Sequence, residues 1–382
     1  MKYSHKSKCF FKRRNISILL LPILLFLSII SCEDNDKEDT LKRYHISMDL
    51  SKSLSFTDFI GKVEVLTFEG TDSSLMKNIT RIRCSFDYIY LSDNSQQIFI
   101  FSKDGKFINK INSRGTGPQE YLNLGSFEID KFGKRICVLD PMRSNLISYS
   151  LKGEFLKIEK LPSLSEGAYG EFCFIENNRI LFTSGNTSAR VTIYNAEKGI
   201  IEREFMPHTL EFTNSSMCKI FNETYLSEEY SDVIYQYANG EVKPSYRIKV
   251  DNLSCNLIGN IGNYDFPENI RKLIDSELSD YYINSVNGNS DILYISLSRK
   301  GNFYSYLIDK DSNKFFCFNV VEKELQPNIK YIDNEMMIGL YIEESKEQYL
   351  KAFSEYGLSL PSEDKLNEMN PILIKYHLKK KI

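Results

Sequence analysis

The segment Phe101-Ser-Lys-Asp-Gly-Lys-Phe107 decides the fold, because close variants of it recur along the chain. In each copy, apolar or aromatic residues flank a short run rich in Asp, Asn and Gly, the residue types that supply the positive φ of a tight turn. Each copy therefore predicts a β-hairpin. The other copies are Tyr149–Phe155, Tyr194–Ile200, Tyr237–Val242 and Ile308–Phe315.

Two further apolar runs lie before most of these hairpins, so the repeating unit has four antiparallel strands. The spacing is 48 residues from Asp104 to Lys152 and 45 from there to Glu197. The 304 residues from Ile79 to the end then divide into six units of about 50. Four strands in each repeat of roughly 40 to 50 residues are typical of a β-propeller.

The composition of single strands favours the same fold. Ile98-Phe-Ile-Phe101 is apolar at consecutive positions, so both faces of this strand must be buried. A two-layer sandwich would leave one face of each sheet in water and would show alternation of apolar and polar residues. Blades packed radially bury both faces. We therefore expect an all-β, six-bladed β-propeller with four-stranded antiparallel blades.

Two segments depart from the repeat and predict small helical insertions. Residues 253–282 contain Ile270, Leu273, Ile274 and Leu278 at helical spacing, and residues 343–368 form a second insertion within the last unit. Pro371–His377 then supplies a closing strand. Val63–Phe68 has no partner nearby in sequence, and we expect it to complete the last blade, because closure removes exposed sheet edges. The propeller is thus expected to span residues 59–382.

The first 31 residues predict an export signal. Six basic residues precede an apolar stretch of 15 residues, Ile16–Ile30, which is shorter than the roughly 20 residues of a membrane span. Ile29-Ile-Ser-Cys32 resembles the bacterial lipobox, and the resemblance implies lipidation of Cys32. An ordinary signal peptide with a chance cysteine is the alternative. Two or three acyl chains suffice for stable anchoring in a membrane.

Residues 32–58 begin with Glu33-Asp-Asn-Asp-Lys-Glu-Asp39, which is too charged to pack, and predict a solvated tether. An acidic cluster after the lipid cysteine resembles the signal that sends lipoproteins of the Bacteroides group to the outer face of the outer membrane. A mere spacer is the alternative, with the periplasmic face as the other location. Asp39-Thr40-Leu41 also fits a short O-glycosylation motif of those bacteria, which makes Thr40 a candidate.

Charge and cysteine usage exclude some classes of function. From Cys32 onward, 42 basic residues stand against 51 acidic ones, so we expect no nucleic acid partner. The remaining cysteines are at least 36 residues apart and mostly lie in apolar runs, which predicts small buried side chains rather than a metal or redox motif. Only three scattered histidines follow the signal segment, so a histidine metal site or a histidine-based triad is not expected.

At this point the sequence resembles a known family, the six-bladed β-propeller lipoproteins abundant in Bacteroides and relatives, which are similar in shape to NHL-type propellers. The resemblance covers Val63 to about Leu378. It is carried by Val63-Glu-Val-Leu66, Phe101–Ile108 and Gly115-Thr-Gly-Pro-Gln-Glu-Tyr121. Members usually have a third glycine where this chain has Gln119. The resemblance implies the fold and says little about a biochemical role.

In a propeller, ligands usually bind at the face formed by the loops between strands two and three of each blade and by the connections between blades. The loop Ser113–Tyr121 is such a connection, with Gly115 and Gly117 offering backbone N–H groups. A phosphate cradle is disfavoured because a strand, not a helix, follows. An alternative is an ion pair between Arg114 and Glu120 that braces a tight loop. The candidate ligand-binding residues are Asp93, Asn94, Arg114, Glu120, Tyr121, Asp140, Arg143 and Arg299.

These residues suggest a polar pocket for a sugar or a peptide, with Tyr121 stacking against the ligand. Carboxylates from different blades could hold Ca²⁺, although the chain has no calcium-loop motif and we expect no cofactor. The leading hypothesis is a lipid-anchored, non-catalytic binding module for a glycan, a peptide or an envelope protein. The alternative is a lyase, glycosidase or metal-dependent lactonase that uses carboxylates such as Asp93, Asp140 or Glu120. A purely assembling propeller would instead expose an apolar patch on the side of a blade.

Overall fold

A computed structural model describes residues 41–164, 168–176, 178–185, 189–207, 215–220, 223–228, 231–253, 255, 280–300, 302–319, 328–341, 354 and 370–379. The export signal, Cys32 and Thr40 lie outside these residues. So does most of both predicted helical insertions, 253–282 and 343–368. No helix in the described part of the chain is long and apolar enough to cross a membrane.

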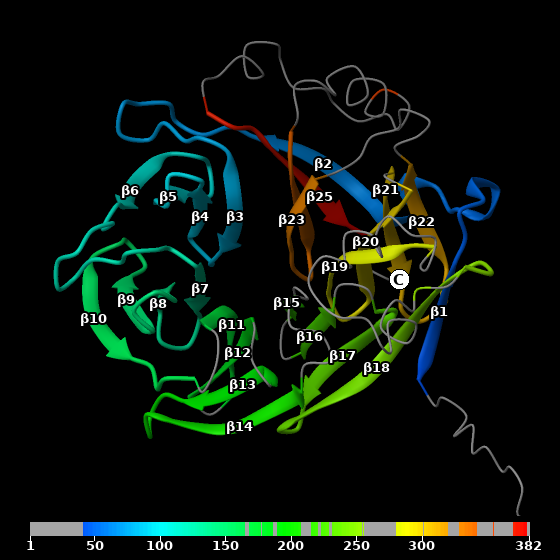
Figure 1. Cartoon of the computed structure of the whole chain (residues 1–382). Coiled ribbons are helices and arrows are strands. Elements are labelled where there is room, and N and C mark those ends of the chain that lie inside the picture. Colours follow the sequence, from blue (N-terminus) through cyan, green and yellow to red (C-terminus); the bar gives the residue numbers. More distant parts are fainter. Residues whose placement is uncertain are drawn as a thin grey trace, which may run out of the picture. The chain divides into compact units, whose positions relative to one another are not determined.

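Residues from Lys42 onward form one compact unit, built of six antiparallel sheets that surround a common centre (Figure 1). Each sheet is one blade, and the strands of a blade are called A to D from the centre outward. The predicted six-bladed propeller with four-stranded blades is confirmed. Blade 1 consists of β3 (Ile79–Cys84), β4 (Tyr88–Asp93), β5 (Ile98–Ser102) and β6 (Phe107–Ile111). Blade 2 consists of β7 (Ser126–Asp130), β8 (Arg135–Asp140), β9 (Asn145–Ser150) and β10 (Phe155–Lys160).

The next two blades complete one side of the ring. Blade 3 consists of β11 (Ala168–Ile175), β12 (Arg179–Gly185), β13 (Ala189–Asn195) and β14 (Ile200–Pro207). Blade 4 consists of β15 (Ser215–Ile220), β16 (Glu223–Glu228), β17 (Val233–Ala238) and β18 (Glu241–Val250). It carries a fifth strand, β1 (Lys42–Ile46), on its outer edge.

Blade 5 consists of β19 (Tyr282–Gly288), β20 (Ile292–Arg299), β21 (Asn302–Asp309) and β22 (Phe315–Asn319). Blade 6 combines β23 (Asn328–Ile332), β24 (Met336–Leu340) and β25 (Leu373–Leu378) with β2 (Ile60–Leu66) from the start of the chain. The A strands of neighbouring blades contact one another all the way round, including β23 of blade 6 with β3 of blade 1. The ring is therefore closed.

Strand β2 seals the ring as the sequence predicts. It pairs antiparallel with β25, with Val63 opposite Tyr376 and Leu66 opposite Leu373. The first and last parts of the chain thus build one sheet, and the outer strand of blade 6 comes from before blade 1. The prediction that the segment beginning at Val63 supplies the missing strand is confirmed.

The prediction that residues 32–58 form a solvated tether is wrong for the second half of this segment. Strand β1 pairs parallel with β18, and its side chains alternate between exposed and buried. It is followed by a short 3₁₀ helix, η1 (Leu50–Lys52), and by a one-turn helix, α2 (Phe56–Phe59), whose two phenylalanines are buried. The folded unit therefore begins near residue 42 rather than at 59, because Tyr44 and Ile46 fill a gap beside blade 4.

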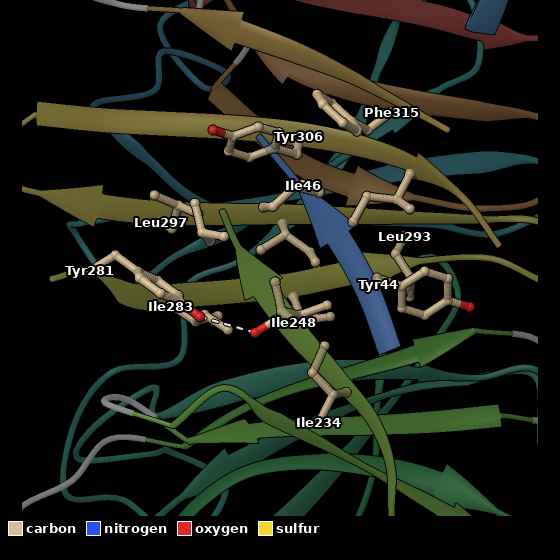
Figure 2. Packing of buried hydrophobic residues seen from close by; sticks show 14 of the residues in the cluster. Tyr44, Ile46, Ile234, Ile248, Tyr281, Ile283, Leu293, Leu297, Tyr306 and Phe315 are labelled. Atoms are coloured by element: carbon tan, nitrogen blue, oxygen red, sulfur yellow. Dashed lines mark hydrogen bonds between the residues drawn. The ribbon is translucent and has the colours of Figure 1, made fainter. Parts of the chain in front are cut away.

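The gap lies in the core between blades 4 and 5. Figure 2 shows Tyr44 and Ile46 of β1 packed among side chains of both blades, including Ile248 and Leu293. The hydroxyl of Tyr281 donates a hydrogen bond to the carbonyl oxygen of Ile248 at 2.9 Å and joins the connection between the blades to β18. Strand β1 is thus a wedge that completes this interface.

Strand β5 demonstrates why consecutive apolar residues are needed. Phe99 and Phe101 belong to the core between blades 6 and 1, whereas Ile98 and Ile100 belong to the core between blades 1 and 2. All four side chains are buried. Burial of both strand faces is therefore confirmed, and each interface of the ring receives alternate residues of the same strand.

The repeated hairpins form the turns between strands C and D. Glycine occupies the predicted turn position with φ of 85° at Gly105, 87° at Gly153, 68° at Gly199 and 81° at Gly240. In blade 5, Asn313 occupies the corresponding turn position, with φ of 57°. A Cβ added at Gly105 would lie 2.0 Å from the carbonyl oxygen of Thr67, so the first hairpin also needs glycine for its contact with the preceding blade.

Five cysteine thiols are buried, as predicted for the cysteines of apolar runs: Cys84, Cys137, Cys173, Cys255 and Cys317. Burial raises the pKa of Cys84 to about 12 and that of Cys137 to about 11. Since only the thiolate is a good nucleophile, these two side chains should be inert in the native protein.

We expect Cys84 and Cys137 to resist a thiol reagent at pH 8 in the folded protein and to react within minutes in urea. Peptide mapping by mass spectrometry after labelling would locate each modified residue. Rapid native labelling of either cysteine would contradict the burial described here.

Candidate functional site

The antiparallel order of the strands divides the connecting loops between two faces of the ring. The A–B face carries the loops from strand A to B and from C to D, which in blades 1 and 2 are residues 85–87, 103–106, 131–134 and 151–154. The B–C face carries the loops from strand B to C and the connections between blades. In blades 1 and 2 these are residues 94–97, 112–125 and 141–144. All eight candidate ligand-binding residues lie at or next to loops of the B–C face.

The connection between blades 1 and 2 is a tight loop held by its own backbone. The N–H of Gly115 donates to the carbonyl of Tyr121 at 3.0 Å, and the N–H of Tyr121 donates to Ser113 at 2.9 Å. The Glu120 carboxylate folds inward and accepts the N–H of Gly117 at 2.6 Å. A Cβ at position 115 would lie 2.1 Å from that carboxylate, which explains the first glycine of the motif.

The expected ion pair between Arg114 and Glu120 is absent from the contacts of this loop. Arg114 is exposed and forms only a backbone bridge with Tyr121. Glu120 instead serves the backbone of Gly117. The N–H group of Gly117 is therefore not available to a ligand. The guanidinium group of Arg114 forms no ion pair with a carboxylate among the described residues.

Tyr121 is fully buried, which is incompatible with the predicted stacking against a ligand. Its hydroxyl donates to the carbonyl oxygen of Gln96 at 2.6 Å, and burial raises its pKa above the usual range. The aromatic ring therefore ties the connection to the B–C turn of blade 1. Sequence alone does not distinguish such an anchor from an exposed aromatic plate.

Asp93 and Asp140 perform the same structural task in successive blades. Each ends strand B, is buried and binds backbone N–H groups. Asp93 accepts from Lys77 at 3.1 Å and from Ser95 at 3.0 Å. Asp140 accepts from Leu122 at 2.9 Å and from Met142 at 3.2 Å. Each carboxylate thus joins its own B–C turn to the connection from the preceding blade.

Arg143, Asn94 and Arg299 differ in their surroundings. One Nη atom of Arg143 donates to the carbonyl oxygens of Glu120 at 3.0 Å and Gly117 at 3.3 Å, so Arg143 braces the loop between blades 1 and 2. The side chain of Asn94 is exposed on the adjacent turn. Arg299 belongs to blade 5 and contacts the sulfur of Met48 at 3.3 Å, away from the other candidates.

The described residues thus bring seven of the eight candidates to one place, where blades 1 and 2 meet, and leave Arg299 apart. Beside Arg114 and Asn94, this place exposes two apolar side chains. Leu122 and Met142 are 38% and 71% exposed, and they are neighbours because both N–H groups bind Asp140. The outer layer of the site is therefore apolar and cationic, over a base of carboxylates that accept backbone hydrogen bonds.

Replacing Asp140 with Ala is expected to destabilise the protein by about 2 to 4 kcal/mol, because two partly buried backbone N–H groups lose their acceptor. Asp140→Asn keeps one carbonyl oxygen and should cost less. Urea unfolding followed by circular dichroism would measure both effects. Asn94→Ala, an exposed change on the same face, should stay within about 0.5 kcal/mol. An unchanged midpoint of urea unfolding for Asp140→Ala would contradict the stabilising role of this carboxylate.

A second polar cluster, which the sequence analysis missed, lies on the innermost strands. The side chain of Glu128 on β7 accepts from the Nε of Arg83 at 2.6 Å and forms an ion pair with Arg81 at 3.6 Å. Arg81 also binds Glu171 on β11, so this cluster joins blades 1, 2 and 3. We call these four residues the hub cluster. Its signal in the sequence is the alternation of charged and apolar residues in Arg81-Ile-Arg-Cys84 and Phe127-Glu-Ile129.

Another basic side chain of the innermost strands is that of Lys330, on β23, the A strand of blade 6. Burial lowers the pKa of its ammonium group. It forms no hydrogen bond or ion pair with the residues that the structure describes. Within the same residues, no group of three or more His, Cys, Asp or Glu side chains could hold a metal ion.

Fold and site together define a six-bladed β-propeller whose B–C face, in blades 1 and 2, is built around buried structural carboxylates. The chain belongs to the family described as a domain of unknown function, DUF4934, whose model matches residues 41–377. That match begins next to β1 and agrees with the start of the folded unit. A search of curated proteins finds no match.

Two solved structures from Bacteroides are similar to the chain. One is a protein from Bacteroides fragilis described as a "Putative exported protein", with 19% identity, a TM-score of 0.69, and coverage of 89% of this chain and 100% of that chain. The other is a member of the DUF4221 family from Bacteroides vulgatus, with 11% identity, a TM-score of 0.51, and coverage of 84% of this chain and 98% of that chain. At these identities the likeness concerns the fold.

Proposed function

We propose that this protein is a lipid-anchored propeller of the bacterial envelope that binds a partner at the B–C face without catalysis. The export signal in residues 1–31 and the lipobox-like Cys32 support the location. The description of the Bacteroides fragilis neighbour as an exported protein agrees with it. The acidic segment after Cys32 resembles a sorting signal of surface lipoproteins and supports attachment to the outer membrane, with the propeller on the cell surface.

The observation that carries the proposal is the engagement of the candidate carboxylates. Asp93, Asp140 and Glu120 each accept backbone N–H groups of the loops that they support. A glycosidase would need a pair of carboxyl groups about 5 to 10 Å apart that are free to exchange protons with the substrate. The carboxylates here hold the face in shape, and the side chains left open to solvent are suited to binding.

The exposed side chains indicate the class of partner. Leu122 and Met142 offer apolar area, and Arg114 offers a planar cation suited to a carboxylate. A protein segment that combines an apolar side chain with Asp or Glu matches this pattern better than a neutral sugar. Among a glycan, a peptide and an envelope protein, we therefore favour the last two.

Site-specific photo-crosslinking in cells tests the proposed face. A photoreactive amino acid at Arg114 or Met142 should yield a defined crosslinked protein, whereas the same group at Lys157, on an outer strand, should not. The purified partner should then bind Arg114→Glu and Met142→Asp variants roughly tenfold more weakly or worse, and Lys157→Glu equally well. Equal binding by all variants, or turnover of a glycoside or lactone by the isolated propeller, would refute the proposal.

Lipid attachment is tested separately. Metabolic labelling with palmitate should mark the wild-type protein and leave the Cys32→Ser variant unlabelled. The variant should also appear in the soluble fraction. Labelling of both proteins would contradict the role of Cys32.

A further inference from the structure

Two phenylalanines stand at neighbouring loop tips of the A–B face and are almost fully exposed. Phe86 is 92% exposed in the turn between β3 and β4, and Phe132 is 83% exposed in the turn between β7 and β8. The corresponding turns of blades 5 and 6 are polar, with sequences Asn289-Ser-Asp291 and Asp333-Asn-Glu335. Single exposed apolar residues are common, but two phenylalanines at equivalent tips of adjacent blades are a pattern.

Both tips have a defined conformation. The turn that carries Phe86 is closed by the N–H of Ser85, which donates to the carbonyl of Tyr88 at 2.9 Å. The turn that carries Phe132 is organised by the buried carboxylate of Asp130, which accepts the N–H of Phe132 at 3.1 Å and that of Gly133 at 2.9 Å. The two rings are therefore presented to solvent by rigid turns.

Contacts between blades 1 and 2 place the tip with Phe86 beside a loop of blade 2 on the same face. The Ser85 hydroxyl lies 3.3 Å from that of Tyr90, which donates to the carbonyl of Leu151 at 3.2 Å. Leu151 begins the C–D loop of blade 2, so that loop lies beside the tip with Phe86. Lys152 follows on the same loop, and its carbonyl accepts the amide of Asn109 at 2.7 Å.

The loops around the two rings are basic, although the chain as a whole carries a formal charge of −3. In the four loops of blades 1 and 2 on this face, five lysines stand against three acidic residues. Within the described part of the chain, the one ion pair that these side chains form joins Lys106 to Asp104 at 3.8 Å. The lysines are Lys103, Lys106, Lys131, Lys134 and Lys152, and the acids are Asp87, Asp104 and Glu154.

Strand β1 enters the propeller from the same side. It runs parallel to β18, which begins directly after the C–D turn at Asn239 and Gly240. The end of β1 at Lys42 is therefore the end nearer the A–B face. Nine residues separate the proposed lipid on Cys32 from Lys42, a reach of roughly 30 Å when extended.

We infer that the A–B face of blades 1 and 2 rests on an anionic bilayer surface, with Phe86 and Phe132 inserted at the level of the headgroups. Aromatic side chains surrounded by lysines are suited to such an interface, because the rings enter the apolar boundary while the ammonium groups meet lipid phosphates. The inference rests on the proposed envelope location and is independent of the partner bound at the B–C face. The opposite face is then left open to solvent for that partner.

The absence of tryptophan from the chain allows a direct test. The ectodomain, residues 33–382, contains every strand of the six blades and lacks the proposed lipid. Single substitutions Phe86→Trp, Phe132→Trp and Met142→Trp each introduce one fluorophore, the last on the B–C face. Vesicles of phosphatidylethanolamine and phosphatidylglycerol should shift the emission at positions 86 and 132 to the blue, and brominated lipids should quench it. The emission at position 142 should not change.

Flotation with the same vesicles measures affinity. The double variant Phe86→Ser, Phe132→Ser should bind roughly tenfold more weakly than wild type, and Lys131→Glu with Lys152→Glu should remove the preference for anionic over phosphatidylcholine vesicles. Leu75→Ser with Met142→Ser, two exposed changes outside this face, should bind as wild type does. All variants should keep the wild-type unfolding midpoint, since the changed side chains are exposed.

Two results would overturn the inference. One is vesicle binding that is absent, or equal in wild type and in the Phe86→Ser, Phe132→Ser variant. The other is a blue shift at position 86 that depends on protein concentration without vesicles, which would identify a second copy of the chain as the occupant. Neither result depends on Cys32 or on the B–C face, so failure here is distinguishable from failure of the proposed function.

Discussion

A chain that begins at Leu54 instead of Leu41 is expected to lose at least about 4 kcal/mol of its free energy of unfolding. The deletion removes β1, whose Tyr44 and Ile46 are almost completely buried between blades 4 and 5. Deleting a buried isoleucine side chain alone costs about 2 to 5 kcal/mol, and a buried aromatic ring costs a similar amount. Urea unfolding of both chains, followed by circular dichroism, would measure the difference.

Point variants separate the effect of the two side chains from that of the truncation. Tyr44→Ala and Ile46→Ala should each reproduce a large part of the loss. Arg43→Ala and His45→Ala, on the exposed side of the same strand, should change stability by less than about 0.5 kcal/mol. If the shortened chain unfolds at the same urea concentration as the longer one, β1 is not part of the stable fold.

Removing the shared acceptor of the hub cluster is the second change with a large expected effect. Glu128→Ala should destabilise the protein by about 3 kcal/mol, because Arg81 and Arg83 remain close together with little access to water. The matched control is Asp104→Ala, which breaks an exposed pair with Lys106 and should cost less than about 1 kcal/mol. Thermal and urea unfolding would quantify both.

A double replacement distinguishes a lost charge partner from lost packing. Arg83→Leu combined with Glu128→Leu removes one cation together with the anion, and Arg81 still has Glu171 as a partner. This variant should therefore be more stable than Glu128→Ala alone. Equal destabilisation by the double variant would show that charge pairing is not what Glu128 contributes.

The propeller could be predicted from the sequence because its signals are local and repeated. The hairpin at Phe101–Phe107 recurs with regular spacing, and glycine or asparagine stands where the turn needs positive φ. Even the closing strand at Val63 could be predicted, since an unpartnered apolar segment and an incomplete last unit imply each other. Strand β1 could not, because its two buried residues, Tyr44 and Ile46, lie in a short segment whose other residues are polar, and they pair with a strand some 200 residues away.

The candidate site could be predicted less completely than the fold, for a physical reason. Residue type identifies Asp93, Asp140 and Glu120 as potential ligands or catalysts, but their function depends on which atoms they bind. Their partners are backbone N–H groups of the adjacent loops, and any sequence supplies such groups. The same holds for Tyr121, whose hydroxyl is taken by a carbonyl oxygen. The sequence therefore identifies the correct loops. Which side chains of these loops are exposed is seen only in the structure.

The pairing of Ile60 with Leu378 also constrains when the molecule can finish folding. During synthesis, β2 emerges first and must wait for β25, the last strand of the chain, before blade 6 can form. Contacts so distant in sequence form slowly, and the blades made earlier remain an incomplete arc until then. For the proposed export this order of folding is favourable, because the ring closes only after the C-terminal strand has been made, and an incomplete ring passes more easily through a translocation channel.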